Sequence, residues 1–284
     1  MKAFKSFFFA VIIPLLFLSC ASPHETGEAK GKLFIIGGGK RPAAMVQRMI
    51  QESGIDKGGY IVILPMASSE PDTSVFYAAK QFIDQGAVHI ADFRFEKGLE
   101  PSAQRIDSLK NAALIYITGG DQNRFMEIVG GTMIEAAIRT CFLNGGMIAG
   151  TSAGAAVMSE KMITGNELKR TDYRETFRTI EANNIELGTG LGFITTAIID
   201  QHFVWRSRHN RLITSVIEHP GLMGIGIDEA TAILVSGNTA EVIGESQVLV
   251  YENPDRSFTV NENEKLGARY LRLRVLLPGE TFGL

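Results

Sequence analysis

The chain has 284 residues, of which 45% are hydrophobic and 21% are charged, an ordinary composition for a globular protein with a sizeable core. Its formal net charge is −3, so it has no general attraction for nucleic acid, and no nucleic-acid partner is expected. The sequence contains no visible internal repeat and no second domain boundary. We therefore expect one domain, from residue 32 to residue 284.

Residues 1–19 resemble a lipoprotein-type signal peptide. A lysine-bearing start precedes an apolar run at residues 7–18, which is short and contains a proline, so an export signal is favoured over a membrane-spanning helix. The following Cys20 resembles the lipidated residue of a bacterial lipobox, although Phe17 is unusual in that motif. We expect an exported lipoprotein, anchored through Cys20 at the cell surface or the periplasmic face and carrying a polar tether at residues 20–31. Cleavage to a free secreted protein is the alternative.

Apolar runs alternate with helical patterns along most of the remaining chain. The first run, residues 33–36, ends in Gly37-Gly38-Gly39 and leads into a helical pattern at residues 42–52. The glycines lack dinucleotide-binding spacing, so they are expected to form a close turn. This alternation predicts an α/β fold, with a doubly wound, mostly parallel sheet and antiparallel strands at the C-terminal end. Further strands are expected at residues 60–64, 88–93, 114–117, 147–149, 195–199, 223–227, 232–236, 240–243 and 247–251, and further helices at 74–85, 102–111, 132–143, 153–158 and 210–218; residues 159–192 are expected to be a loop-rich insertion.

The segment Gly150-Thr151-Ser152-Ala153-Gly154 joins an apolar run to small, helix-compatible residues. Such a strand-to-helix turn is typical of an exposed serine nucleophile, because the small neighbours leave the hydroxyl accessible. The amides of Ala153 and Gly154 are free to stabilise an oxyanion. A structural turn with an incidental serine is the alternative, because Gly-x-Ser-x-Gly also occurs by chance. Cys141 is expected to be a buried small residue rather than a nucleophile.

A serine nucleophile needs a base, and the chain has five histidines. Only His202 directly follows a predicted parallel strand, so it is expected at the same edge of a single sheet as Ser152. This position favours His202 as the general base. The residues alone leave the acid that orients the imidazole open among Glu167, Asp172 and Asp200, with Glu160 behind them.

Two further segments predict a substrate site. The turn Gly119-Gly120-Asp121-Gln122 follows a predicted strand, so the amide of Gly120 is a second candidate oxyanion donor and Gln122 a candidate substrate contact; the alternative is a tight turn in which Asp121 caps a helix. Three arginines, at positions 206, 208 and 211, crowd the segment after His202. They favour a carboxylate-rich substrate, or else they pair with acids in residues 159–186.

Together these segments resemble the cyanophycinase and dipeptidase E family of serine peptidases, with cyanophycinase the nearer match. The resemblance covers essentially residues 32–284. It rests on the following motifs: Gly119-Gly120-Asp121-Gln122, Gly150 to Ala155, Asp200-Gln201-His202-Phe203 with the three arginines, Gly226-Ile-Asp-Glu-Ala-Thr-Ala232, and Val275-Leu-Leu-Pro-Gly279.

The resemblance implies a flavodoxin-like core related to class I amidotransferases, with no metal or organic cofactor. It implies Ser152 as nucleophile, His202 as base and Glu167 as the acid. It further implies oxyanion donors at Gly120 and Ala153, and a substrate site lined by Gln122, Asp200, Gln201, Arg206, Arg208 and Arg211.

The activity implied is a serine exopeptidase that releases β-aspartyl-arginine units from an arginine-bearing polyaspartate through an acyl-enzyme. An α-aspartyl dipeptidase on the same fold and a non-catalytic surface-anchored binding protein are the alternatives. A membrane anchor departs from the cytoplasmic placement of the family's storage-granule enzymes, and suits the use of an external polymer or another aspartyl peptide. A homodimer is among the oligomeric states left open.

Overall fold

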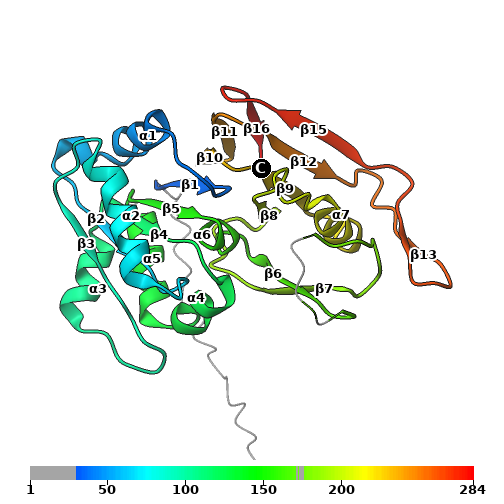
Figure 1. Cartoon of the computed structure of the whole chain (residues 1–284), viewed down its shortest axis with the longest axis horizontal. Helices are drawn as coiled ribbons and strands as arrows, with labels where there is room; N and C mark the ends of the chain where they lie inside the picture. Colours follow the sequence, from blue (N-terminus) through cyan, green and yellow to red (C-terminus); the bar gives the residue numbers. More distant parts are fainter. Residues whose placement is uncertain (1–29, 171, 173–175) are drawn as a thin grey trace, which may run out of the picture.

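The computed structural model describes residues 30–170, 172 and 176–284 (Figure 1). The expected signal peptide, Cys20 and nearly all of the expected tether lie outside the described residues. Within the described part of the chain, no helix has both the length and the apolar character needed to cross a membrane.

An eight-stranded sheet forms the centre of the protein, in the order β16-β11-β10-β1-β5-β4-β2-β3. Five neighbouring strands, β1, β5, β4, β2 and β3, run parallel to one another. The other three join antiparallel at the β1 edge. The predicted fold class, mostly parallel at the core with antiparallel strands from the C-terminal part, is therefore confirmed. The strands are β1 (Lys32–Ile36), β2 (Ile61–Leu64), β3 (Ile90–Asp92), β4 (Leu114–Ile117), β5 (Met147–Thr151), β10 (Thr231–Ser236), β11 (Thr239–Gly244) and β16 (Thr281–Gly283).

Helices cover both faces of this sheet because its central strands are apolar on both sides. In β1, Phe34 and Ile36 pack on one face with α1 (Ala43–Ser53) and α2 (Pro71–Ile83). Leu33 and Ile35 point to the opposite face. That face packs against α3 (Ala103–Lys110), α4 (Gln122–Val129), α5 (Met133–Leu143) and α6 (Ala153–Ala156). A 3₁₀ turn, η1 (Ile55–Lys57), follows α1.

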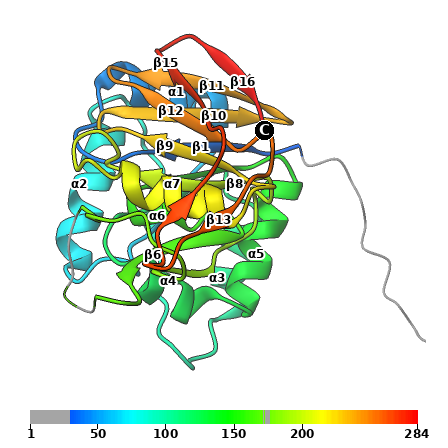
Figure 2. The ribbon, with the colours of Figure 1, turned by 90° about the vertical axis from the view of Figure 1, so that its right-hand side faces the viewer.

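A separate four-stranded sheet carries the segment around His202 (Figures 1 and 2). Its order is β15-β12-β9-β8, in which β8 and β9 are parallel and the other pairs antiparallel. Helix α7 (His209–Glu218) packs on it through Leu212 and Val216. The expectation of a single sheet is wrong, since the chain changes sheets between β9 and β10 within residues 228–230. The strands are β8 (Ala197–Gln201), β9 (Met223–Ile227), β12 (Val248–Glu252) and β15 (Arg272–Leu276).

The expected loop-rich insertion contains an antiparallel pair of strands, β6 (Lys161–Glu167) and β7 (Ile185–Thr189). The register shifts between Ile163 and Glu167, and this irregularity accounts for the weak strand pattern in the sequence. Helix α4 was expected only in the alternative in which Asp121 caps a helix. A small hairpin of β13 (Thr259–Val260) and β14 (Leu266–Gly267) completes the fold.

Candidate active site

Ser152 lies in the sharp turn between β5 and α6. Its backbone has φ 54° and ψ −110°, a conformation that non-glycine residues rarely adopt and that is held only where the surroundings enforce it. Here the Ser152 amide donates a hydrogen bond to the carbonyl of Ile36 in β1, at 3.0 Å. The structure thus has the strained strand-to-helix turn that the sequence predicts.

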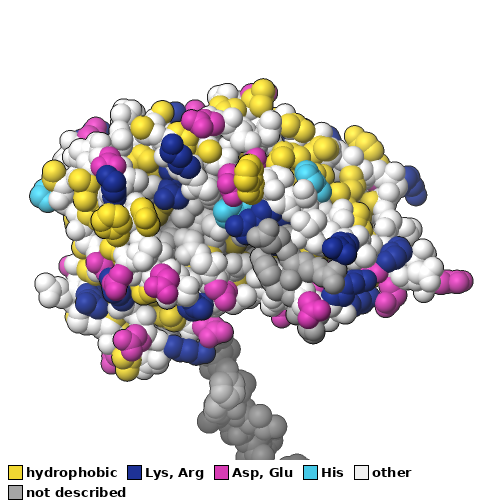
Figure 3. Space-filling view, in the orientation of Figure 1, with side chains coloured by type: hydrophobic (Ala, Val, Ile, Leu, Met, Phe, Trp, Pro, Cys, Tyr) yellow, Lys and Arg dark blue, Asp and Glu magenta, His cyan; other side chains and the backbone are white. Residues whose placement is uncertain are grey.

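His202 follows β8 of the second sheet, and its side chain reaches Ser152 across the boundary between the sheets. Its Nε2 lies 2.9 Å from Ser152 Oγ, and its Nδ1 lies 2.6 Å from Glu229 Oε1. The amide of His202 donates to the carbonyl of Gly37 at 2.7 Å, which ties the histidine loop to the end of β1. Figure 3 shows a histidine beside arginine or lysine side chains near the middle of one face. The serine and histidine are therefore brought together as expected, but from two sheets.

The carboxylate on His202 is Glu229, and the expectation of Glu167 is not met. Glu167 ends β6 and accepts hydrogen bonds from Asn184 Nδ2 at 2.7 Å and Arg170 Nη1 at 3.5 Å. It is buried by these contacts, away from the imidazole. Of the other candidate acids, Asp200 pairs with Arg211, and Asp172 and Glu160 are exposed.

A signal for Glu229 was present in the sequence. It lies just after β9, which runs parallel to β8, and the loops after parallel strands are where functional residues gather. The same rule that nominated His202 therefore nominates this loop. The motif from Gly226 to Ala232 is also part of the family resemblance, which by itself implies no role for Glu229.

The pKa of His202 is lowered from its usual value of 6.5. Burial is the largest cause, because it disfavours the charged imidazolium. The hydrogen bond with Glu229 acts in the opposite direction, and the charges of Arg206 and Arg208 lower the pKa further. The imidazole is therefore neutral at neutral pH, and can accept a proton from the serine hydroxyl.

The backbone amides of Gly120 and Ala153 are available beside Ser152. Ala153 follows the serine directly, and Gly120 lines the same pocket as Ser152. Across the described residues, neither amide has a hydrogen-bond acceptor within the protein. Two such donors near a serine hydroxyl can stabilise the oxyanion of a tetrahedral intermediate.

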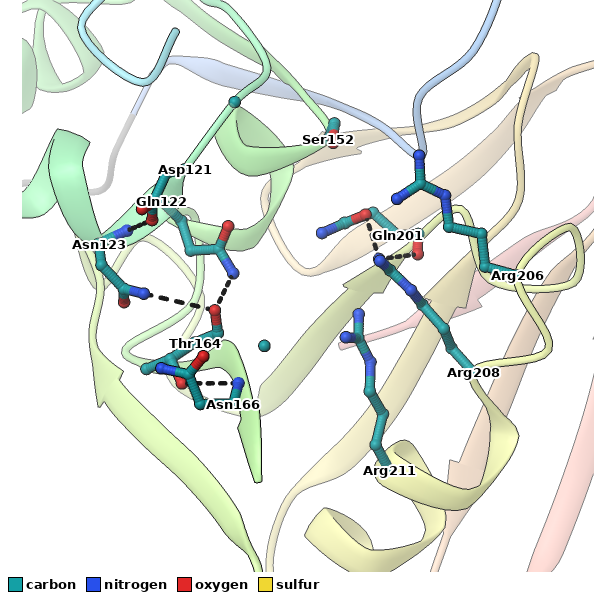
Figure 4. A pocket seen from close by; sticks show the side chains of 12 residues that line it. Asp121, Gln122, Asn123, Ser152, Thr164, Asn166, Gln201, Arg206, Arg208 and Arg211 are labelled. Atoms are coloured by element: carbon teal, nitrogen blue, oxygen red, sulfur yellow. Dashed lines mark hydrogen bonds between the residues drawn. The ribbon is translucent and has the colours of Figure 1, made fainter. Parts of the chain in front are cut away.

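A pocket of about 290 Å³ opens beside Ser152. In Figure 4, arginines and Gln201 from β8 and the segment after it face polar residues of α4 and β6 across this pocket. On the side opposite the arginines, Gln122 links α4 to β6, because its Nε2 donates to the carbonyls of Ile163 and Thr164 at 2.9 and 2.7 Å. The lining residues are Gly120, Asp121, Gln122, Asn123, Ser152, Thr164, Gly165, Asn166, Gln201, Arg206, Arg208 and Arg211.

The buried arginines of the pocket are held by residues of β8. Arg211 Nε donates to Asp200 Oδ2 at 2.7 Å, and Arg208 Nη1 donates to the carbonyl and Oε1 of Gln201 at 2.9 and 2.6 Å. The acid paired with Arg211 is therefore Asp200, not one from residues 159–186. Asp200 itself is 1% exposed and does not line the pocket, so its position is behind Arg211 rather than against a ligand.

The remaining sequence expectations at the site are structural. Asp121 caps α4, because its Oδ1 accepts from the amide of Asn123 at 2.8 Å. Cys141 is buried, and burial raises the pKa of its thiol to about 12, so it has no thiolate at neutral pH. The described residues contain no group of three or more His, Cys, Asp or Glu side chains that could hold a metal ion.

Comparison with known proteins gives a consistent result. Residues 33–243 match peptidase family S51. The chain is 35% identical over 278 residues to a cyanophycinase of Trichormus variabilis, covering 94% of this chain and 89% of the relative. It is 30% identical over 271 residues to a cyanophycinase of Synechococcus elongatus, covering 92% and 81% of the two chains.

Two solved structures share the fold. A peptidase from an acI-B1 actinobacterium superimposes with a TM-score of 0.65 at 20% identity, covering 91% of this chain and 98% of the other. A putative peptidase E protein from Listeria monocytogenes gives a TM-score of 0.54 at 16% identity, covering 76% and 99%. The length of the family match and the identity to curated relatives establish that the chain belongs to peptidase family S51 and is a hydrolase of the serine exopeptidase type.

Proposed function

We propose that this protein hydrolyses β-aspartyl-arginine units from an arginine-bearing polyaspartate, or from a related peptide, through an acyl-enzyme. The observation that carries the proposal is the hydrogen-bonded chain from Ser152 Oγ through the imidazole of His202 to Glu229. A carboxylate on Nδ1 holds the imidazole in the tautomer whose Nε2 can accept the serine proton.

In the proposed reaction, Ser152 Oγ attacks the scissile carbonyl carbon while its proton passes to His202 Nε2. The oxyanion of the tetrahedral intermediate accepts hydrogen bonds from the amides of Gly120 and Ala153. The intermediate collapses as its C–N bond breaks, and the imidazolium gives its proton to the departing amine. Water, deprotonated by His202, then attacks the ester and releases the acid and free Ser152.

The substrate class follows from the pocket next to Ser152. Arg206, Arg208 and Arg211 bring three guanidinium groups to the lining of this pocket, so it is suited to an anionic ligand. Guanidinium groups bind carboxylates with matched geometry. In a polyaspartate that carries arginine on its side chains, each unit retains the carboxylate of the arginine. The relatives named cyanophycinase support a substrate of this kind.

A direct test compares release of β-aspartyl-arginine from cyanophycin with hydrolysis of α-aspartyl dipeptides. Wild-type protein should act on the polymer, and Ser152→Ala should lower the rate by roughly 10⁴- to 10⁶-fold, as expected when a serine nucleophile is removed. A serine-reactive fluorophosphonate should label Ser152 in the wild type only. Turnover of α-aspartyl dipeptides alone would select the dipeptidase alternative. Absence of both labelling and turnover would select a binding protein.

Export and lipid anchoring through Cys20 form a second part of the proposal, supported by the sequence of residues 1–20. A bacterial host fed a labelled fatty acid should incorporate it into the full-length protein and retain the protein in the membrane fraction. Cys20→Ser should abolish both. Incorporation that persists in the variant would contradict the assignment.

A further inference from the structure

A second hollow, of about 240 Å³, shares Ser152 with the arginine pocket. It lies at the carboxyl ends of β1, β4 and β5, next to the first turns of α2. Among the described residues, Ser152 alone lines both hollows. A peptide bond seated on Ser152 therefore has one hollow available for each of its two halves. The lining residues of the second hollow are Gly38, Gly39, Arg41, Thr73, Ser74, Tyr77, Ala78, Tyr116, Thr118, Gly119, Thr151 and Ser152.

Two buried hydroxyl groups in this hollow have no protein partner. Tyr116 is 1% exposed and Thr151 is 7% exposed, and in the described part of the chain neither hydroxyl oxygen makes a hydrogen bond. Buried hydroxyls are almost always paired, since leaving one unsatisfied is costly. Tyr116 is also held in place by edge-to-face packing with Phe82, at 5.3 Å between ring centroids. Both residues line the hollow, and their hydroxyl oxygens have unused hydrogen-bonding capacity that a polar ligand can satisfy.

The hollow also has a fixed positive charge and, within residues 30–170, 172 and 176–284, no acidic lining residue. The guanidinium of Arg41 donates through Nε to Gln81 Oε1 and through Nη1 to the carbonyl of Gly39, the latter at 2.9 Å. These two bonds orient the group and use two of its five donors. A carboxylate fits this combination of one cation and neutral hydroxyls, whereas a terminal amine does not.

We infer that this hollow is the subsite for the terminal, leaving unit of the peptide, whose free carboxylate it binds through Arg41 and the Tyr116 and Thr151 hydroxyls. The inference rests on the proposed function. An exopeptidase must recognise a chain end, and a cationic hollow of this kind recognises the carboxyl end. The unit that forms the acyl-enzyme then occupies the arginine pocket on the other side of Ser152.

The inference is tested with a dimer of β-aspartyl-arginine units, offered with a free or an amidated main-chain carboxyl terminus. Wild-type protein should prefer the free form. Arg41→Met should lower kcat/KM for the free form by about 10- to 100-fold, and should remove the preference. Tyr116→Phe should lower kcat/KM by a smaller factor without lowering the melting temperature, because the lost hydroxyl has no protein partner among the described residues. Lys40→Met is the matched control, since Lys40 is a neighbouring exposed cation outside the hollow, and should change neither rate.

Two further measurements separate this inference from the proposed function. Fluorophosphonate labelling of Ser152 should proceed at the wild-type rate in Arg41→Met, showing that the Ser152–His202 pair is intact. Calorimetric binding of the two dimers to Ser152→Ala, with and without Arg41→Met, measures recognition without turnover. A preference for the free carboxylate that is equally strong with and without the Arg41→Met change would overturn the subsite. A wild type that binds in an Arg41-dependent way but cleaves neither dimer would instead overturn the proposed function.

Discussion

Gly38 lies directly against the imidazole ring of His202: a Cβ atom on Gly38 would be 2.3 Å from Cε1 and 2.5 Å from Nε2 of the histidine. Its φ of +119° is also disfavoured for other residues. Because the ring is hydrogen-bonded to both Ser152 and Glu229, it cannot move away without losing one of these hydrogen bonds. Gly38→Ala should therefore lower kcat by roughly 100-fold, the effect expected of a misplacement of about 1 Å.

The control for Gly38→Ala is Gly54→Ala. Gly54 has φ +75°, but a Cβ there would meet nothing within 4 Å. Both changes should lower stability by about 1–2 kcal/mol through backbone strain, measured by thermal unfolding. Only Gly38→Ala should slow the reaction of fluorophosphonate with Ser152. Equal loss of activity in the two variants would mean that contact with His202 is not the reason for the glycine.

Replacing Glu229 should test its role in orienting His202. Glu229→Gln keeps the size of the side chain but removes the charge that stabilises the imidazolium formed during the reaction. We expect kcat to fall by roughly 10²- to 10⁴-fold, by analogy with the corresponding change in a Ser-His-Asp triad. The measurement is steady-state hydrolysis of the β-aspartyl-arginine dimer.

Glu167→Gln is the informative comparison, because Glu167 is the acid that the family resemblance implies. Its contacts with Asn184 and Arg170 are structural, so the variant should unfold at a lower temperature while kcat stays within a few-fold of the wild type. A larger loss of kcat in Glu167→Gln than in Glu229→Gln would reverse the assignment made from the geometry.

Much of the fold could be predicted because the central strands carry a strong local pattern. The strand expected at residues 114–117 and the one expected at residues 223–227 have these same bounds in the structure. No comparable pattern in the sequence predicts the division into two sheets. It depends on which strands pair, and β9 and β10 are both short, apolar strands that are separated by only three residues.

At the candidate site, too, residues that a local sequence pattern marks could be predicted, whereas contacts between distant segments could not. Ser152 and His202 were identifiable because each follows its own strand. Glu229 also follows a strand, but its contact with His202 depends on the pairing of β9 with β8, which spacing along the chain does not encode. The role of Gly38 was likewise invisible, since it depends on a close approach to His202, which is far away along the chain. The sequence suggested only a close turn there.

The pH dependence of activity should reflect the lowered pKa of His202. The specificity constant kcat/KM should rise with pH as His202 loses its proton. The apparent pKa of this rise should lie below 6.5, because burial disfavours the imidazolium. The same shift makes the folded protein lose stability as the pH falls from 6.5 towards the folded-state pKa, since the unfolded chain then binds the proton more readily.

Arg206→Gln should shift this rise of kcat/KM, the acid limb of the pH profile, to higher pH. The charge of Arg206 lowers the pKa of His202, so removing it brings the pKa closer to 6.5. The profile should be recorded with a neutral activated ester as well as with the anionic dimer, because Arg206 also lines the substrate pocket. A limb that stays in place with the ester would show that the charge of Arg206 has no effect on His202.

The buried pair of Asp200 and Arg211 should couple stability to substrate binding. Both side chains are at most 3% exposed, and Asp200 also accepts the Gln201 amide at 2.7 Å. Asp200→Asn leaves the Arg211 charge buried without its counter-charge, which should destabilise the protein by about 3–5 kcal/mol. It should also raise KM for the dimer more than it lowers kcat, because Arg211 lines the pocket but does not reach Ser152 or His202 by any hydrogen bond in the described residues.

Glu252→Gln provides the matched comparison for Asp200→Asn. Glu252 binds Arg272 through two hydrogen bonds of 2.9 Å, as Asp200 binds Arg211, but the side chain of Arg272 is 52% exposed. Water solvates that guanidinium when its partner is lost, so the unfolding midpoint and KM should both stay close to wild type. If the two variants unfolded at the same denaturant concentration, burial of Arg211 could not be what makes Asp200 necessary, and the pocket arginines would have to be positioned by Gln201 and α7 alone.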